Sequence, residues 1–208
     1  MRSPKSVAKL DDLGRVRLSQ NFFMRDFLYS EIANLHGLPN IPEDPDLAIE
    51  AGSRLCQDLL EPLNATFGRI AIRSAYRSPT VNHFGNENGL NCASNEANYA
   101  SHIWDRRDAQ GRMGATACIV VPSFADRVEA GADWQEMAWW IHDHLPYSSL
   151  YFFPIRAAFN IAWREEPERR IDSYIAPKGC LTKPGMGNHE GEHSTAYEVL
   201  LRAFEGSA

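Results

Sequence analysis

The sequence predicts a single α+β domain. Apolar residues recur at helical spacing in the early part of the chain, strand-like patterns come later, and strands and helices do not alternate regularly. The chain has 208 residues, which is the length of one domain, and 44% of them are hydrophobic, enough to bury a core. We therefore expect helices and a sheet to share one core.

Helices are expected on both sides of Gly37. Residues 24–36 place apolar side chains at helical spacing, and Gly37 suits the left-handed conformation that ends many helices. Residues 45–65 repeat the apolar stripe over a greater length, and this helix should end before Gly68.

Strands are expected on both sides of a polar segment in the middle of the chain. Residues 69–74 alternate polar and apolar side chains, which is typical of a strand with one buried face. Residues 115–121 form a continuous apolar run that Pro122 ends, which predicts a buried strand. Between them, residues 82–99 are rich in Asn and Gly, which predicts a long irregular loop.

A further helix should begin near Asp133. Asp133 and Glu136 have the spacing of a capping box, and helical spacing continues to about residue 144. The tryptophans of this helix are expected in the core. Beyond it we expect strands over 147–153 and 157–163, a loop after 174 and a short helix over 194–204.

Composition excludes several classes of protein. A formal net charge of -6 argues against nucleic-acid binding, which needs clustered Lys and Arg. No apolar run approaches the about 18 residues that cross a bilayer, so no membrane span is expected. The basic N-terminus lacks a following apolar segment, and the cysteines are spread singly. We therefore expect a cytoplasmic protein with reduced thiols.

One string carries a family resemblance. Residues 67–79 read Phe-Gly-Arg-Ile-Ala-Ile-Arg-Ser-Ala-Tyr-Arg-Ser-Pro, and Asn82 follows. With weaker matches over about 18–163, this string resembles the zinc D-alanyl-D-alanine carboxypeptidases of the Hedgehog/DD-peptidase fold, whose pattern is S-G-Y-R-S-P-x-x-N. The resemblance implies an antiparallel sheet with packed helices. It divides the chain into an N-terminal extension (1–17), a DD-carboxypeptidase-like domain (18–175) and a C-terminal loop with a short helix (176–208).

The resemblance also assigns a substrate-binding group. Arg77 takes the position of the arginine that binds the substrate's carbonyl or carboxylate in the family, a role that suits a planar guanidinium. Ser78, Asn82, Trp104 and Asn160 are further candidates for substrate binding.

The family's zinc centre is altered at several positions. Ser101-His102 matches the first zinc ligand, but Cys118 stands where the family has Asp and Asn160 where it has the third His. The run Leu150-Tyr-Phe-Phe has no Glu to act as general base. A thiolate binds zinc well, whereas a neutral amide is a poor ligand. His102 and Cys118 alone would hold zinc weakly.

Other residues offer alternative chemistry. Asp105 and Asp108 follow His102 closely, and they are either part of a catalytic loop or a solvated charge cluster. Cys118 is either a nucleophile paired with His102 or a buried, inert thiol. Residues 189–193 spell H-E-x-x-H, but Gly191 favours a loop over the helix that a zinc protease needs, and this loop is a candidate lid.

Our hypothesis is a divergent DD-carboxypeptidase-like enzyme that acts on a small peptide or amino-acid-derived substrate without the family's usual zinc centre. Its cleft would be lined by His102, Cys118, Asn160 and Asp105. Two alternatives remain open: a metallopeptidase whose zinc site is rebuilt from His102, Cys118 and an inserted Asp, and a non-catalytic domain that binds peptide or peptidoglycan fragments. The sequence leaves the substrate's identity and the oligomeric state open.

Overall fold

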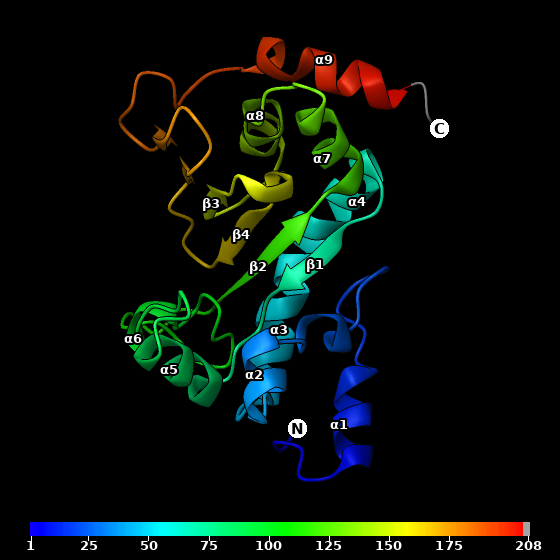
Figure 1. Ribbon diagram of the computed structural model, residues 1–208, viewed down its shortest axis with the longest axis vertical. Helices are drawn as coiled ribbons and strands as arrows, with labels where there is room; N and C mark the ends of the chain where they lie inside the picture. Colours follow the sequence, from blue (N-terminus) through cyan, green and yellow to red (C-terminus); the bar gives the residue numbers. More distant parts are fainter. Residues whose placement is uncertain (206–208) are drawn as a thin grey trace.

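A six-stranded mixed sheet is the centre of the fold (Figure 1). The computed structural model describes residues 1–205. Its strands are β1 (Ala71–Ser74), β2 (Gly114–Val120), β3 (Ser149–Phe152), β4 (Phe159–Arg164), β5 (Arg170–Ser173) and β6 (Gly179–Thr182), in the order β1-β2-β4-β3-β5-β6. The α+β class is confirmed. The expected antiparallel sheet needs one correction, because β3 and β5 pair in parallel.

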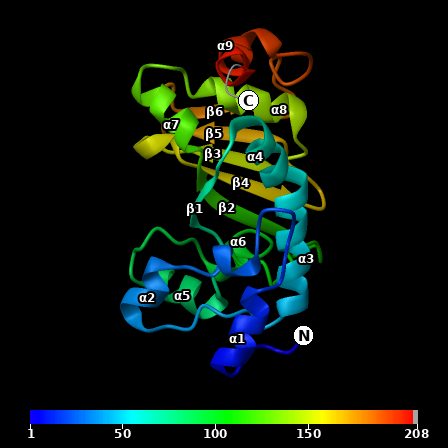
Figure 2. The same ribbon diagram turned by 90° about the vertical axis from the view of Figure 1, so that its right-hand side faces the viewer.

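Helices precede, interrupt and follow the sheet. They are α1 (Val7–Gly14), α2 (Glu31–His36), α3 (Pro45–Leu55), α4 (Glu61–Phe67), α5 (Pro79–Glu87), α6 (Asn95–Asn98), α7 (Pro122–Glu129), α8 (Gln135–His144) and α9 (Ser194–Glu205), with 3-10 turns at Met24–Phe27 and Ile155–Ala157. A π-helical segment, Cys56–Leu60, joins α3 to α4. The predicted long helix is thus confirmed, and it runs beside the sheet (Figure 2).

Three expected segments differ from the structure. The helix expected over 24–36 is divided, because the hydroxyl of Ser30 accepts a hydrogen bond from the backbone of Ala33 and starts α2 there. The irregular loop expected over 82–99 contains the end of α5 and all of α6. Ser78 and Ser94 cap these helices, and the Ser-Pro start of α5 outweighs the local Asn and Gly content. Finally, β6 lies where a loop was expected, since a short, half-polar strand gives little periodic signal.

The two faces of the sheet have different roles. Ala117 and Ile119 of β2 and Ile161 of β4 join the hydrophobic core, against which α3 packs. Because side chains alternate along a strand, Cys118 and Asn160 project from the opposite face. The core also includes residues outside the expected main domain, namely Leu13 of α1, and Tyr197 and Leu200 of α9.

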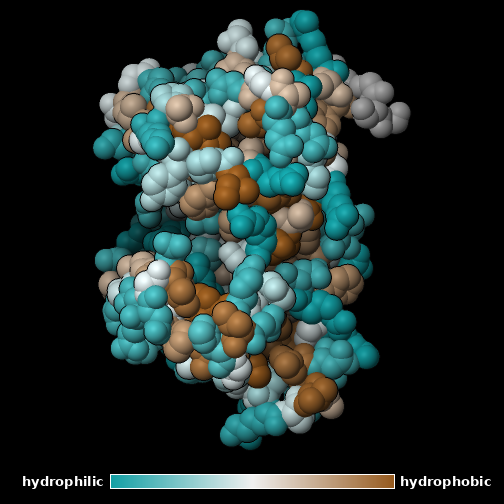
Figure 3. All heavy atoms as spheres, in the orientation of Figure 1, coloured by the Kyte–Doolittle hydropathy of each residue, from teal (hydrophilic) through white to brown (hydrophobic). Residues whose placement is uncertain are grey.

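The exterior is polar over most of the face seen in Figure 3, where hydrophobic groups are separated by hydrophilic ones. Trp134, Trp139 and Trp140 are buried, as expected. Among residues 1–205, no helix is both long enough and apolar enough to cross a membrane.

Candidate functional site

A hollow of about 450 Å³ lies against the sheet face that carries Cys118 and Asn160. Arg77 and His102 line it as well, together with residues of α2 and of the 90–92 turn. The structure therefore brings together four residues that are far apart in the sequence. We call this hollow the cleft.

Strand pairing places the floor of the cleft. Cys118 on β2 is the direct partner of Asn160 on β4, and Ser74 on β1 is its partner on the other side. Directly paired residues on antiparallel strands have Cβ atoms about 5 Å apart on one face. A thiol, an amide and a hydroxyl thus form a row across three strands.

His102 is fixed beside this row by its neighbours in the chain. The carbonyl of Ser101 accepts a hydrogen bond from the backbone of Thr116 at 3.0 Å, and the indole of Trp104 donates to the carbonyl of Thr116 at 3.2 Å. Gly114 permits this close contact, because a Cβ there would collide with the carbonyl oxygen of Ala100. The turn that carries His102 is therefore attached to β2 just before Cys118.

The His102 ring is held in one tautomer. Its Nδ1 lies 2.9 Å from the carbonyl oxygen of Ala75, which can only accept, so Nδ1 carries the proton. Burial, followed by the positive charge of Arg77, lowers the pKa of His102 to about 3. The ring is neutral at pH 7, and its Nε2 is a hydrogen-bond acceptor with no partner among residues 1–205.

Arg77 is held from several sides. Its backbone donates to the carbonyl of His102 at 2.8 Å, and its guanidinium donates to Asn82 Oδ1 at 3.3 Å and to Cys92 Sγ at 2.9 Å. Asn82 is fully buried and donates in turn to Asn95 and to the carbonyl of Ala93. Asn82 therefore positions Arg77 and does not line the cleft itself.

The cleft has an excess of positive charge. Arg73 and Arg77 line it together with one carboxylate, Glu31. Burial raises the pKa of the Cys118 thiol, although the two arginines act in the opposite direction. In the ligand-free cleft, Cys118 is a thiol and His102 is a neutral imidazole, and the arginines favour an anionic ligand.

The other predicted site residues lie outside the cleft. Asp105 is buried next to the residues that precede α3, where it accepts a hydrogen bond from the backbone of Glu43 at 2.7 Å, and burial raises its pKa. Asp108 caps a turn by accepting from the backbones of Gln110 and Arg112. Trp104 is fully buried in the core, and Ser78 caps α5. The expectation that Asp105 lines the cleft is corrected, because its carboxylate is used to anchor α3.

The cleft residues do not fit a zinc centre. Within residues 1–205, three ligand atoms of His, Cys, Asp or Glu come within 4.8 Å of one another only at His142, Asp143 and His193. None of these lines the cleft. Cys92 and Glu31 also line the cleft, but among residues 1–205 neither completes a group of three ligand atoms with His102 and Cys118 within that distance. A catalytic zinc needs three protein ligands. A zinc site rebuilt from His102, Cys118 and Asp105 or Asp108 is therefore not supported by the donor set.

Sequence reasoning missed part of the cleft. Arg73 and Glu31 line it, and neither was singled out from the sequence, whereas Cys92, which also lines it, is one of the possible donors that the sequence offers in the 82–99 segment. Arg73 belongs to the string that carries the resemblance, so its charge was an available signal. Cys92 lies in the segment that was expected to be irregular, and no pattern there pointed to Arg77.

The H-E-x-x-H segment is a loop, as its glycines indicated, but it does not cover the cleft. His189 and His193 contact α8, and none of residues 189–193 lines the cleft.

Comparison of the chain with protein-family models, with curated proteins and with solved structures gave no match.

Proposed function

We propose that the cleft binds the carboxylate of a small peptide or amino-acid-derived ligand, and that the protein is a divergent DD-carboxypeptidase-like enzyme that works without the family's usual zinc centre. One observation carries the proposal. Arg77, His102, Cys118 and Asn160, the positions that the resemblance singles out, line one cleft.

Ligand binding follows from the charges and donors. The Arg77 guanidinium can donate two parallel hydrogen bonds to a carboxylate, and Arg73 adds a second positive charge. Asn160 offers both a donor and an acceptor to a peptide group. A ligand that ends in a free carboxylate meets these requirements, and its amidated counterpart does not.

Binding of the carboxylate would also make His102 more basic. A carboxylate on Arg77 offsets the positive charge that lowers the pKa of His102, so the ring becomes a better proton acceptor. The Cys118 sulfur would then attack the carbonyl carbon of the ligand's amide, and the thiol proton would move to Nε2 of His102. As the C–N bond breaks, that proton passes to the leaving amine. Water then hydrolyses the thioester and restores the thiol.

One observation favours a second candidate, a domain that binds such ligands without chemistry. Burial raises the pKa of Cys118 and lowers that of His102, so the resting pair is uncharged and lacks a thiolate. A protein that only binds a carboxylate needs neither a thiolate at Cys118 nor a charged His102.

Calorimetric titration with a D-alanyl-D-alanine dipeptide and with its C-terminal amide tests the binding. We expect the free acid to bind and Arg77→Ala to weaken its affinity roughly 10- to 100-fold, the effect of one charged hydrogen-bonding group. Arg107→Ala, which removes an exposed arginine outside the cleft, is the matched control. Equal affinity of wild type and Arg77→Ala would overturn the proposal.

Chromatographic detection of released D-alanine separates the two candidates. Turnover that is abolished in Cys118→Ser, with binding retained, supports the enzyme. Binding without release by the wild type supports the non-catalytic domain.

A further inference from the structure

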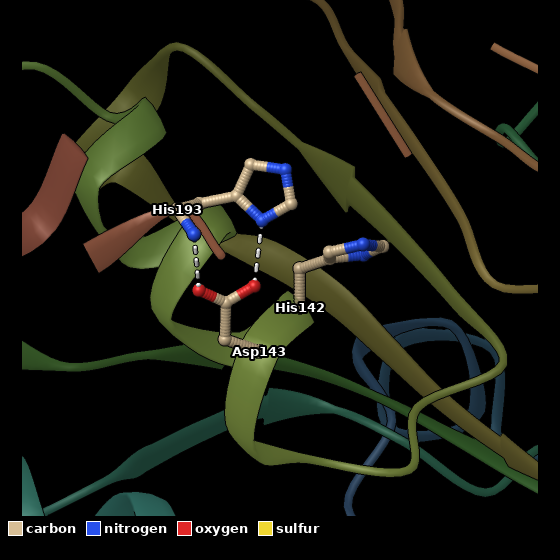
Figure 4. A group of neighbouring side chains, drawn as sticks. All are labelled: His142, Asp143 and His193. Carbon is tan, nitrogen blue, oxygen red and sulfur yellow. Dashed lines mark hydrogen bonds and ion pairs between the residues drawn. The ribbon is translucent and has the colours of Figure 1, made fainter. Parts of the chain in front are cut away.

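A second group of polar residues lies away from the cleft, where the 183–193 loop contacts α8. His142 and Asp143 belong to the last turn of α8, and His193 approaches them from the loop (Figure 4). One ligand atom of each residue lies within 4.8 Å of those of the other two. We call these three residues the histidine cluster.

We propose that the histidine cluster binds a divalent transition metal of the Zn²⁺ type through Nδ1 of His142, Nδ1 of His193 and the carboxylate of Asp143. Imidazole and carboxylate are both established zinc ligands. The proposal is independent of the function of the cleft.

The outer hydrogen bonds favour this choice of atoms. Nε2 of His142 lies 2.8 Å from the carbonyl oxygen of His189, and Nε2 of His193 lies 3.0 Å from that of Asn188. Carbonyl oxygens only accept, so both Nε2 atoms carry protons. Histidines that bind metals commonly donate their second N–H to a backbone carbonyl in this way, which orients the ring. Nδ1 is the remaining nitrogen of each ring. In His193 it faces Asp143, and in His142 it accepts a hydrogen bond from the Tyr147 hydroxyl at 2.7 Å, which a metal would have to displace.

Two distances within the cluster can be compared with those of a zinc site. Nδ1 of His193 lies 2.7 Å from Asp143 Oδ1, so in the metal-free form the Nδ1 proton occupies the place of the ion. Ligand distances of about 2.0–2.2 Å and tetrahedral angles place two donors about 3.3 Å apart. The distance between Nδ1 of His193 and Oδ1 of Asp143 must therefore increase by roughly 0.6 Å when a metal binds. The His142 and His193 ring centroids are 5.3 Å apart, near the about 5 Å expected for two imidazoles on one zinc.

The surroundings hold the ligands and admit an ion. The His193 ring stacks on Trp139 at 4.2 Å, and Asp143 Oδ2 accepts hydrogen bonds from Tyr197 and from the backbone of His193. His142 and Asp143 line a hollow of about 570 Å³, which leaves room for a fourth ligand such as water. Its charged side chains other than His are Asp143, Arg169, Glu190 and Glu192, and this acidic excess favours a cation.

The H-E-x-x-H segment takes part in a way that its pattern does not predict. In a helix both of its histidines would bind the metal from one face. Here His193 offers its ring, whereas His189 offers only its carbonyl to His142. The metal would connect the C-terminal loop to α8.

Calorimetric titration of the chelator-treated full chain with Zn²⁺ tests the site. We expect one ion per chain, with affinity weakened at least about 100-fold in His193→Ala and in Asp143→Asn. The second variant keeps the size of the side chain and so limits any effect on folding. His83→Ala, which removes an exposed histidine on α5, is the matched control and should bind as the wild type does.

A measurement on the wild type alone complements these variants. Long-range ¹H–¹⁵N spectra of the imidazoles should show that Zn²⁺ shifts the Nδ1 signals of His142 and His193 and leaves their Nε2–H groups protonated. Absence of Zn²⁺ binding, equal affinity in both variants and the wild type, or metal on Nε2 would each overturn the proposal.

Discussion

The cleft and the histidine cluster are lined by different elements: α2, β1, β2 and β4 contribute to the cleft, and α8 and α9 contribute to the hollow beside the cluster. In Figure 1, α2 is separated from α8 and α9 by the strands β1, β2 and β4. The cleft combines one imidazole and two thiols with two arginines, whereas the cluster combines two imidazoles with a carboxylate in acidic surroundings. Cations near a site oppose metal binding and favour anions. The donor set and the local charge therefore decide which of the two regions suits a metal, and the position of the Ser74–Pro79 string does not.

Among variants that should affect the cleft but not the histidine cluster, Gly114→Ala is expected to have the largest effect. A Cβ at this position would collide with the Ala100 carbonyl and lie 2.9 Å from the Trp163 carbonyl, both backbone atoms that cannot turn aside. We expect unfolding in urea to show a loss of roughly 1–3 kcal/mol in the free energy of unfolding, together with weaker ligand binding in the cleft. Zn²⁺ binding by the folded variant should be unchanged.

Gly187→Ala is the matched control. Its Cβ would meet no atom within 4 Å, so its stability should equal that of the wild type. If Gly114→Ala behaved in the same way, the close contact between β2 and the turn of His102 would not be needed for the cleft.

A second effect comes from the burial of His102. Its pKa falls from an ordinary 6.5 to about 3 on folding, so the unfolded chain binds the extra proton first as the pH falls. The stability that His102 contributes is fully present above pH 6.5 and is lost progressively towards pH 3. The slope is about 1.4 kcal/mol per pH unit, or roughly 2 kcal/mol between pH 6.5 and 5.

Denaturation of wild type and His102→Asn across this pH range checks the expectation. Asparagine keeps an N–H for the Ala75 carbonyl but does not titrate, so the variant should lose this part of the acid sensitivity. A variant with the same pH dependence as the wild type would show that His102 is not buried as a neutral ring.

The smallest effect is expected for Glu31→Gln. Glu31 is the one carboxylate among the residues that line the cleft in the described part of the chain, and it is exposed. Its neutralisation should strengthen binding of the dipeptide acid by roughly two- to fivefold, the range of exposed charge pairs. Glu50→Gln on α3 should have no effect. Weaker binding in Glu31→Gln would mean that the cleft favours a cationic group.

The sequence allowed the α+β class and most helix and strand positions to be predicted, because long apolar stripes and runs dominate local structure. Some shorter elements were not predicted. Ser78 and Pro79 start α5, which continues into the segment that is rich in Asn and Gly, and β6 has only four residues. Asp105 was expected in the cleft because it follows His102 closely in the sequence. Its actual role depends on a hydrogen bond from the backbone N–H of Glu43, which sequence spacing does not reveal. The histidine cluster depends on the docking of the 183–193 loop on α8, which no local pattern records.

Zinc content after equilibration with Zn²⁺ and removal of unbound metal, measured by elemental analysis on wild type, His102→Ala and His193→Ala, tests the central contrast most directly. We predict about one zinc per chain in the wild type and in His102→Ala, and loss of zinc in His193→Ala. Loss of zinc in His102→Ala with retention in His193→Ala would contradict the account, because it would place the metal in the cleft.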